Sequence, residues 1–355
     1  MALGITLQSG SPLIGSPIIY QVQASNLSQG HPNLTFHRVI LEVSVSCPAL
    51  SMAQKKYEFP LPVKTESASS YVHADISSAL VAFIDEYTYN YQTSGTREYP
   101  VLTVTVKAWD EFMSNGILTT NYQPYQEGGQ TPTTRYYLLG AFTDLERITS
   151  GLTRGVDTLT RKPATGEIVP NAGLYISPAA YTFAVNTWFA GGTAPSAPST
   201  SVTNLANKTA GRAFTLNGRS IWVDDKGQPF VAFQFVNGYG VLESAFAVTL
   251  PEEKVVKSVK EYVVTAPMGF NSINRSVTRK NSSRHTFKMS SGNVTEEWQH
   301  WWQEEFLNAR QAWMLIGTNW IPCSIIPEDE TDGIDLTEDK MPEVLFTAKL
   351  NIEGI

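Results

Sequence analysis

The sequence predicts a mainly β protein. We expect a β-sandwich-like N-terminal domain and a second antiparallel β domain with one packed, tryptophan-rich helix. Two observations predict this class. Runs of alternating apolar and polar residues recur along the chain, as half-buried strands require. Charged residues make up only 17% of the 355 residues, against about 25% in an average protein, while aromatic residues, Thr, Ser, Gly and Pro are plentiful.

Residues 1–145 contain the strands of the first domain. Alternating segments are expected as strands at 18–23, 36–46, 100–109 and 136–142. One helix of about ten residues is expected after Asp75 or Ser77, either of which can serve as its N-cap. These elements together predict a sandwich crossed by a single helix.

Residues 146–210 are expected to form a polar connector. Within it, residues 191–201 read GGTAPSAPSTS, which is typical of either a flexible linker or a loop extended along a neighbouring subunit. The sequence leaves both possibilities open.

Residues 211–355 predict the second domain. A meander is expected from strands at 214–223, 230–236 and 241–250, with a tight turn at Asn237-Gly238. Further strands are expected at 255–266, and at 273–280 and 284–289 paired across Asn281-Ser282-Ser283. The closing elements are a helix at 296–310 and strands at 312–316, 320–326 and 343–352.

The helix at 296–310 is the element around which the second domain is organised. One helical face carries Trp298, Trp301, Trp302, Phe306 and Ala309. Thr295 can serve as the N-cap, and Glu296 and Glu297 suit the positive first turn. Burying three tryptophans contributes on the order of 10 kcal/mol as an upper bound. We therefore expect a sheet or a neighbouring subunit to cover this face.

Composition and motifs exclude several functions. The net charge of −7 argues against non-specific binding of nucleic acid, and no apolar run approaches the 18 residues of a membrane span. The five histidines lack zinc-ligand spacing, and neither a nucleophile elbow nor a phosphate loop occurs. We expect no enzyme, no cofactor and no metal. Cys47 and Cys323 are far apart and favour free thiols in a reducing compartment over a disulfide.

Paired carboxylates are the remaining candidates for catalysis. Asp110 and Glu111, beside Trp109 at a strand end, would suit a glycosidase best. Adjacent residues of a strand point to opposite faces, however, so only one of the two could reach a substrate. The acidic segment 328–339 could bind Ca²⁺ but lacks EF-hand spacing, which favours a solvated loop.

Positive charge is concentrated in one segment. This basic strip consists of Arg275, Arg279, Lys280, Arg284, His285 and Lys288. It could meet the acidic segment 328–339, within the chain or across a subunit interface, or it could face a phosphate polymer. The acidic segment is the preferred partner because it requires no further molecule.

Two segments of the second domain carry a family resemblance. They are FQFVNGYGVLESAFAVTL at 233–250, and the pattern W298…W302…EFLNAR…WMLIGTNWIPCSII followed by EVLFTAKLNI. Together, over roughly residues 210–355, they resemble structural proteins of bacteriophage and prophage tails, of the tail-tip, distal-tail or baseplate type found in phages of Bacteroides-like hosts. The resemblance implies β-layers that form rings, and it carries over no catalytic residue.

From this resemblance we expect a virion structural protein that oligomerises in a tail tip or baseplate, assembled in the bacterial cytoplasm. Its partners would be further copies in a ring and neighbouring tail or virion proteins, with no membrane. The interface residues expected are Trp298, Trp301, Trp302, Trp320, Tyr239, Arg275, Arg279, Arg284 and Lys288. Alternatives are a capsid or head-to-tail accessory protein, or a carbohydrate- or receptor-binding module. The binding module would need an exposed platform of Trp109, Tyr122 and Tyr125.

Overall fold

A computed structural model describes residues 3–350, apart from 26, 28–32, 65–69, 85–86, 88, 128–132, 151–155, 157, 183–193, 265–274 and 329–341. Over 250–264 and 275–284 it describes the backbone alone. The predicted fold class is confirmed: the chain is mainly β, with several antiparallel sheets and one short tryptophan-rich helix. No helix among the described residues is long and apolar enough to cross a membrane.

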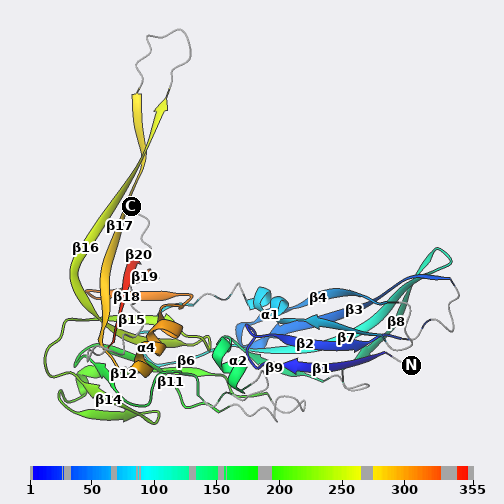
Figure 1. Cartoon of the computed structure of the whole chain (residues 1–355), viewed down its shortest axis with the longest axis horizontal. Helices are drawn as coiled ribbons and strands as arrows, with labels where there is room; N and C mark the ends of the chain where they lie inside the picture. Colours follow the sequence, from blue (N-terminus) through cyan, green and yellow to red (C-terminus); the bar gives the residue numbers. More distant parts are fainter. Residues whose placement is uncertain are drawn as a thin grey trace, which may run out of the picture.

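The N-terminal unit is a sandwich of two antiparallel sheets (Figure 1). The smaller sheet has the order β1 (Gly4–Gly10), β2 (Ile18–Gln23), β5 (Tyr71–Asp75). The larger sheet has the order β4 (Met52–Pro62), β3 (Leu34–Cys47), β7 (Val101–Ser114), β8 (Ile117–Gln126), and β9 (Arg135–Leu138) also pairs with β7. Helix α1 (Ser77–Ile84) follows β5, where the Ser77 amide donates to the Asp75 carboxylate.

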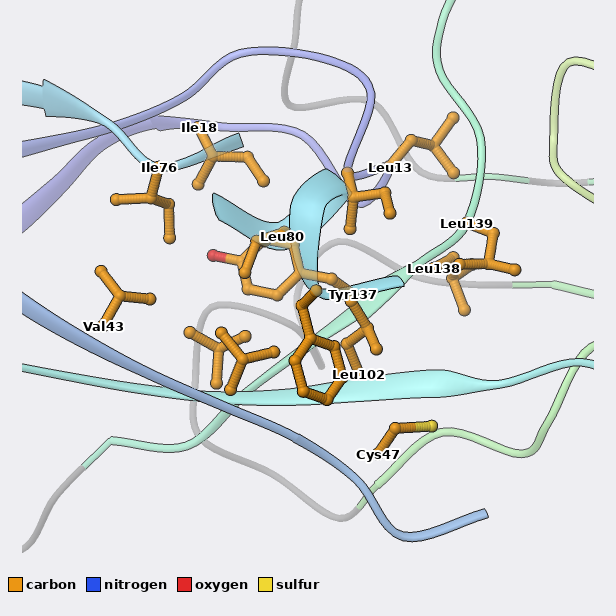
Figure 2. Close-up of a cluster of buried hydrophobic side chains, with 14 of the residues drawn as sticks. Leu13, Ile18, Val43, Cys47, Ile76, Leu80, Leu102, Tyr137, Leu138 and Leu139 are labelled. Atoms are coloured by element: carbon orange, nitrogen blue, oxygen red, sulfur yellow. The ribbon is translucent and has the colours of Figure 1, made fainter. Parts of the chain in front are cut away.

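One continuous apolar core joins the two sheets of this unit. Figure 2 shows Ile18 of the smaller sheet and Val43 and Leu102 of the larger sheet converging on Leu80 of α1. All four side chains are fully buried. Alternation along the strands supplies this core because every second residue points inward. Cys47 lies in the same core, and both cysteines are buried free thiols.

The stretch expected as a connector contributes strands to two small sheets. One has the order β10 (Glu167–Val169), β14 (Arg219–Val223), β13 (Ala213–Leu216). The other has the order β11 (Leu174–Pro178), β12 (Ser199–Asn204), β6 (Thr96–Glu98), so β12 pairs with a strand of the N-terminal half. Helix α2 (Asp144–Ser150) precedes them.

The expectation of a linker or extended loop at 191–201 is wrong at its C-terminal end. Residues 191–193 lie outside the described residues, but β12 begins at Ser199, and Thr200 is fully buried between β11 and β6. The Thr200 hydroxyl donates to the side chain of Gln92 at 2.7 Å, and Gln92 in turn exchanges two 2.8 Å hydrogen bonds with the side chain of Gln234. The polar composition suits the strand because these polar atoms are paired.

The C-terminal unit is a closed antiparallel barrel. Its strands run in the order β15 (Phe230–Val236), β16 (Leu242–Val264), β17 (Arg275–Asn293), β20 (Glu343–Leu350), β19 (Asn319–Pro327), β18 (Ala312–Ile316). The predicted turn at Asn237-Gly238 is confirmed, since the Asn237 side chain accepts from the amides of Tyr239 and Val241. Closure leaves no open edge within the barrel itself.

Two strand predictions are corrected. The segments 241–250 and 255–266 belong to one strand, β16, which passes Pro251 through a register shift between Thr249 and Glu253. A bulge accommodates the proline, which cannot donate to the ladder. The predicted hairpin across Asn281-Ser282-Ser283 is also wrong, because these residues pair with Val259, Ser258 and Lys257 of β16 inside one continuous strand, β17.

The tryptophan-rich helix is shorter than predicted. Helix α4 (Glu296–Trp301) passes into a π-helical turn, η3 (Trp302–Phe306), and regular helix ends there rather than at residue 310. The wider turn brings the rings of Trp302 and Phe306 to a centroid distance of 4.8 Å in an edge-to-face arrangement. Thr295 occupies the N-cap position, but its side chain makes no capping hydrogen bond.

Candidate interaction site

The aromatic interface candidates are buried within the chain's own cores. Trp298, Trp301 and Trp302 fill the barrel around Phe306, each with no more than 5% of its surface exposed. Trp320 packs beside Tyr91, with ring centroids 6.4 Å apart, and Tyr239 is buried at the junction of the two units. None of these side chains presents a broad face to a partner. The strands of the barrel cover the tryptophan-bearing face of the helix. Of the two coverings expected from the sequence, a sheet or a neighbouring subunit, the structure shows the first.

The backbone of the two units meets at a glycine. Gly140, in the N-terminal unit, has φ +95°, and a Cβ at this position would clash with the backbone of Gly238 and Tyr239 in the β15–β16 turn. The next amide, that of Ala141, donates to the Gly238 carbonyl at 2.8 Å. This close approach requires glycine both for its positive φ and for the missing side chain.

Arg161 ties this junction together. Its Nη2 donates to Glu146 of α2 at 2.7 Å and to the Ala141 carbonyl at 2.8 Å, and its Nη1 donates to Glu305 of η3. The guanidinium also lies 4.0 Å from the centroid of the Tyr239 ring. One cation therefore contacts the N-terminal unit, the turn and the helix of the barrel. A cavity of about 330 Å³ opens beside it.

A second buried network lies between β10, β11 and β16. Lys162 Nζ donates to Glu167 at 2.6 Å and to the Ser244 carbonyl at 2.5 Å. Tyr175 and Arg219 each donate to the other oxygen of Glu167 at 2.7 Å. The network reaches the helix, because Lys162 Nζ lies 5.1 Å from the centroid of the Trp301 ring. Charged side chains that are buried away from water destabilise the fold unless they are paired in this way.

The charges of these networks set their pH response. Burial alone would raise the pKa of Glu146, but the hydrogen bond and charge of Arg161 bring it below its ordinary value. Burial would likewise raise the pKa of Glu167, and the charges of Lys162 and Arg219 lower it. A depressed folded-state pKa stabilises the fold above the unfolded-state value, and this stabilisation is lost as the pH falls through the folded-state value.

Glu243 behaves in the opposite way and gives a test of the networks. It is 1% exposed and accepts from Thr160 Oγ1 at 2.5 Å and from Asn237 Nδ2 at 3.3 Å. Burial raises the pKa of Glu243 above 4.5, more than the charges of Lys162 and Arg219 lower it. The stability that this group contributes is therefore present below pH 4.5 and is lost as the pH rises through the folded-state value.

Between pH 5 and pH 8, Glu243→Gln is expected to be at least as stable as the parent, and its advantage should increase with pH until the folded-state pKa of Glu243 is passed. The amide nitrogen can donate to Thr160 Oγ1, and the amide oxygen can accept from Asn237 Nδ2. Urea midpoints across this pH range test the expectation, with Glu98→Gln at an exposed position as the control. A variant that is destabilised equally at every pH would contradict it.

The best catalytic candidates and one sugar-platform residue are engaged within the fold. Asp110 is buried and bonded to Ser25 Oγ at 2.5 Å and to His37 Nε2 at 2.9 Å, while Glu111 pairs with Arg38. The carboxylate lies between serine and histidine, so the histidine does not contact the serine as a catalytic triad requires. Of the residues expected in a sugar platform, Trp109 is only 7% exposed, and the side chain of Tyr122 lies outside what the structure describes.

All of the basic strip except Lys288 lies on the part of β17 that leaves the barrel. Pairing of β17 with β20 ends at Thr286–Lys349, and pairing of β16 with β15 ends at Phe230–Val248. Beyond these points, the pairing that the described residues show for 255–264 and 275–285 is with each other, and Figure 1 shows the resulting ribbon projecting from the barrel. We call this ribbon the arm. Arg275, Arg279, Lys280 and Arg284 belong to it through their backbone, and Lys288 is an exposed residue at its base.

Acidic residues gather at the opposite end of the barrel. Glu296 and Glu297 of α4 are exposed, and exposed Glu343 of β20 pairs with Asn293 at the far end of β17. A cavity of about 480 Å³ adjoins them, lined by Glu343, Asn293 and the three tryptophans of the helix among others. The acidic segment 328–339 begins at the same end, but all of it after Glu328 lies outside the described residues. We call the surface of Glu296, Glu297 and Glu343 the acidic end.

Sequence reasoning missed the two buried networks. Arg161 and Lys162 appear in the sequence only as charges in a polar stretch, and their partners lie up to 144 positions away. Among the described residues, no group of three or more His, Cys, Asp or Glu side chains is placed to hold a metal ion. No protein-family model, curated protein or solved structure matches the chain.

Proposed function

We propose that this protein is a structural subunit of a virion, in the tail tip or baseplate of a bacteriophage, and that it works by oligomerising there. The arm carries the proposal. It is a two-stranded ribbon of ten residues per strand or slightly more, and at about 3.3 Å per residue it reaches about 30 Å beyond the barrel.

The physics of an isolated ribbon supports this assignment. A lone two-stranded ribbon is marginally stable in water, and both of its outer edges carry unpaired backbone donors and acceptors. A neighbouring subunit can satisfy these groups and bury the ribbon. The sequence resemblance to tail proteins over residues 210–355 agrees with assembly of this kind, since the arm and the barrel both lie within that range.

Size measurements test the proposal. Light scattering and negative-stain images of the purified protein should show ring-like oligomers. A variant in which Asn-Gly replaces residues 257–283 should remain a folded monomer, because barrel pairing ends at Val248 and Thr286, outside the deletion. A parent protein that stays monomeric at high concentration, alone and with other tail proteins, would contradict oligomeric assembly.

A capsid or head-to-tail accessory protein is the alternative within the same class. Both would oligomerise, so the size of the assembly does not separate them. Labelling of intact virions with an antibody to this chain does, because the tail-tip proposal requires the label at the distal end of the tail.

A further inference from the structure

The arm and the body of the protein carry opposite charge. By sequence, residues 255–264 and 275–285 hold six basic residues and one acidic residue, a net charge of +5. The whole chain carries −7, so the remainder carries −12. Within the arm, Lys260 and Lys280 are register partners. Like charges placed directly opposite each other destabilise a ribbon, and an acidic partner surface would relieve that repulsion.

The acidic end of the same chain is badly placed to be that partner. Along β17, the arm leaves the barrel at Thr286, whereas the acidic end lies at Asn293, about 20 Å further along the strand in the other direction. Figure 1 shows β16 and β17 running away from α4 as they leave the barrel. The two complementary surfaces therefore face opposite ways on one molecule.

We infer that the arm of one copy binds the acidic end of the next copy, so that subunits join head to tail. This inference rests on the proposed oligomeric function and names its contact. Glu296, with 70% of its side chain exposed, Glu297 and Glu343 supply the negative charge. The adjoining cavity of about 480 Å³, whose mixed lining includes Ile168, Phe230 and Val294, gives the aliphatic stems of lysine and arginine a surface to pack on.

A head-to-tail contact has a geometric consequence. The two surfaces that meet are different, so each copy keeps one free arm and one free acidic end until the assembly closes. Such a contact builds a ring if the rotation between neighbours closes, and a filament if it does not. A symmetric dimer through the arms alone would instead place two arms, each with a net charge of +5, against each other, and they would repel.

Charge reversal tests the contact. Lys257→Glu with Lys260→Glu in the arm, and separately Glu296→Lys with Glu297→Lys at the acidic end, should each raise the concentration needed for assembly about tenfold or more. The variant that carries all four changes should assemble again, because complementarity is restored. Glu58→Lys with Glu98→Lys, at exposed positions elsewhere, makes the same change in net charge as the acidic-end variant and should leave assembly unchanged.

The outcomes separate the contact from the proposed function. If the parent forms rings and the acidic-end variant assembles as the parent does, the contact is wrong while the oligomeric function stands. If only the arm variant fails, without rescue by the four-fold variant, the arm binds another surface. If the arm binds a short DNA duplex and the acidic-end changes have no effect on assembly, the arm is a nucleic-acid contact and the inference is overturned. A parent that never oligomerises overturns both.

Discussion

Phe306→Ala is expected to destabilise the barrel by about 3–5 kcal/mol, the usual cost of removing a fully buried phenylalanine. Phe306 is 0% exposed, and four aromatic rings surround it edge-to-face. Their centroids lie 4.8–5.4 Å away and belong to Phe233, Phe235, Trp302 and Phe346. These rings come from η3, β15 and β20, so little local movement can fill the space that alanine leaves.

Urea unfolding followed by tryptophan fluorescence measures this loss, because three tryptophans lie in the same core. Phe36→Ala is the matched control. Phe36 is 37% exposed and belongs to β3 of the N-terminal unit, so its removal leaves no closed cavity. Equal shifts of the unfolding midpoint in the two variants would show that Phe306 does not hold the barrel together.

Arg161→Met is expected to cost about 3–5 kcal/mol, because it leaves two carboxylates buried without their cation. Glu305 has 2% of its side chain exposed, and Glu146 has 15%. Methionine preserves much of the side-chain volume of arginine but has no hydrogen-bond donor. The variant should also become more sensitive to proteases between the two units, since Arg161 contacts both of them.

The matched control is Arg38→Met. Arg38 also pairs with a glutamate, Glu111, but 37% of its side chain is exposed, so the expected cost is about 0–1 kcal/mol. Adding Glu305→Gln to Arg161→Met should recover part of the lost stability by removing a buried charge. If Arg161→Met and Arg38→Met lose equal stability, Arg161 is an ordinary surface ion pair and not the junction.

Local patterns in the sequence predict the elements that depend on neighbouring residues. The spacing of Trp298, Trp301, Trp302 and Phe306 gives the buried face of the helix, and Asn237-Gly238 gives the first turn of the barrel. Alternation gives β3, β7 and β20 with small errors at their ends. Each of these features depends on residues close together in the sequence, so the periodicity of apolar residues and the preferences of turn residues predict it.

The features that sequence reasoning missed depend on distant partners. Pro251 and the polar run 281–283 look like breaks, yet β16 and β17 continue through both. Pairing resumes at Glu253 after the bulge at the proline, and residues 281–283 pair with residues 257–259. Lys162 looks like a solvated charge until the fold brings Glu167 and the Ser244 carbonyl around it. The end of the helix at Phe306 follows from aromatic packing against β15 and β20, which no spacing reveals.

The pairing of β6 with β12 bears on the order in which the protein can be made. Ribosomal synthesis releases residues 96–98 well before residues 199–201, their partners in the sheet, and Gln92 before Gln234. The N-terminal sandwich can collapse early around its own core, but this flank stays unpaired until β12 has emerged, and Gln92 waits for β15, the first strand of the barrel. Pairing of residues 92–98 therefore follows the collapse of the sandwich and joins it to segments of the chain that are made later.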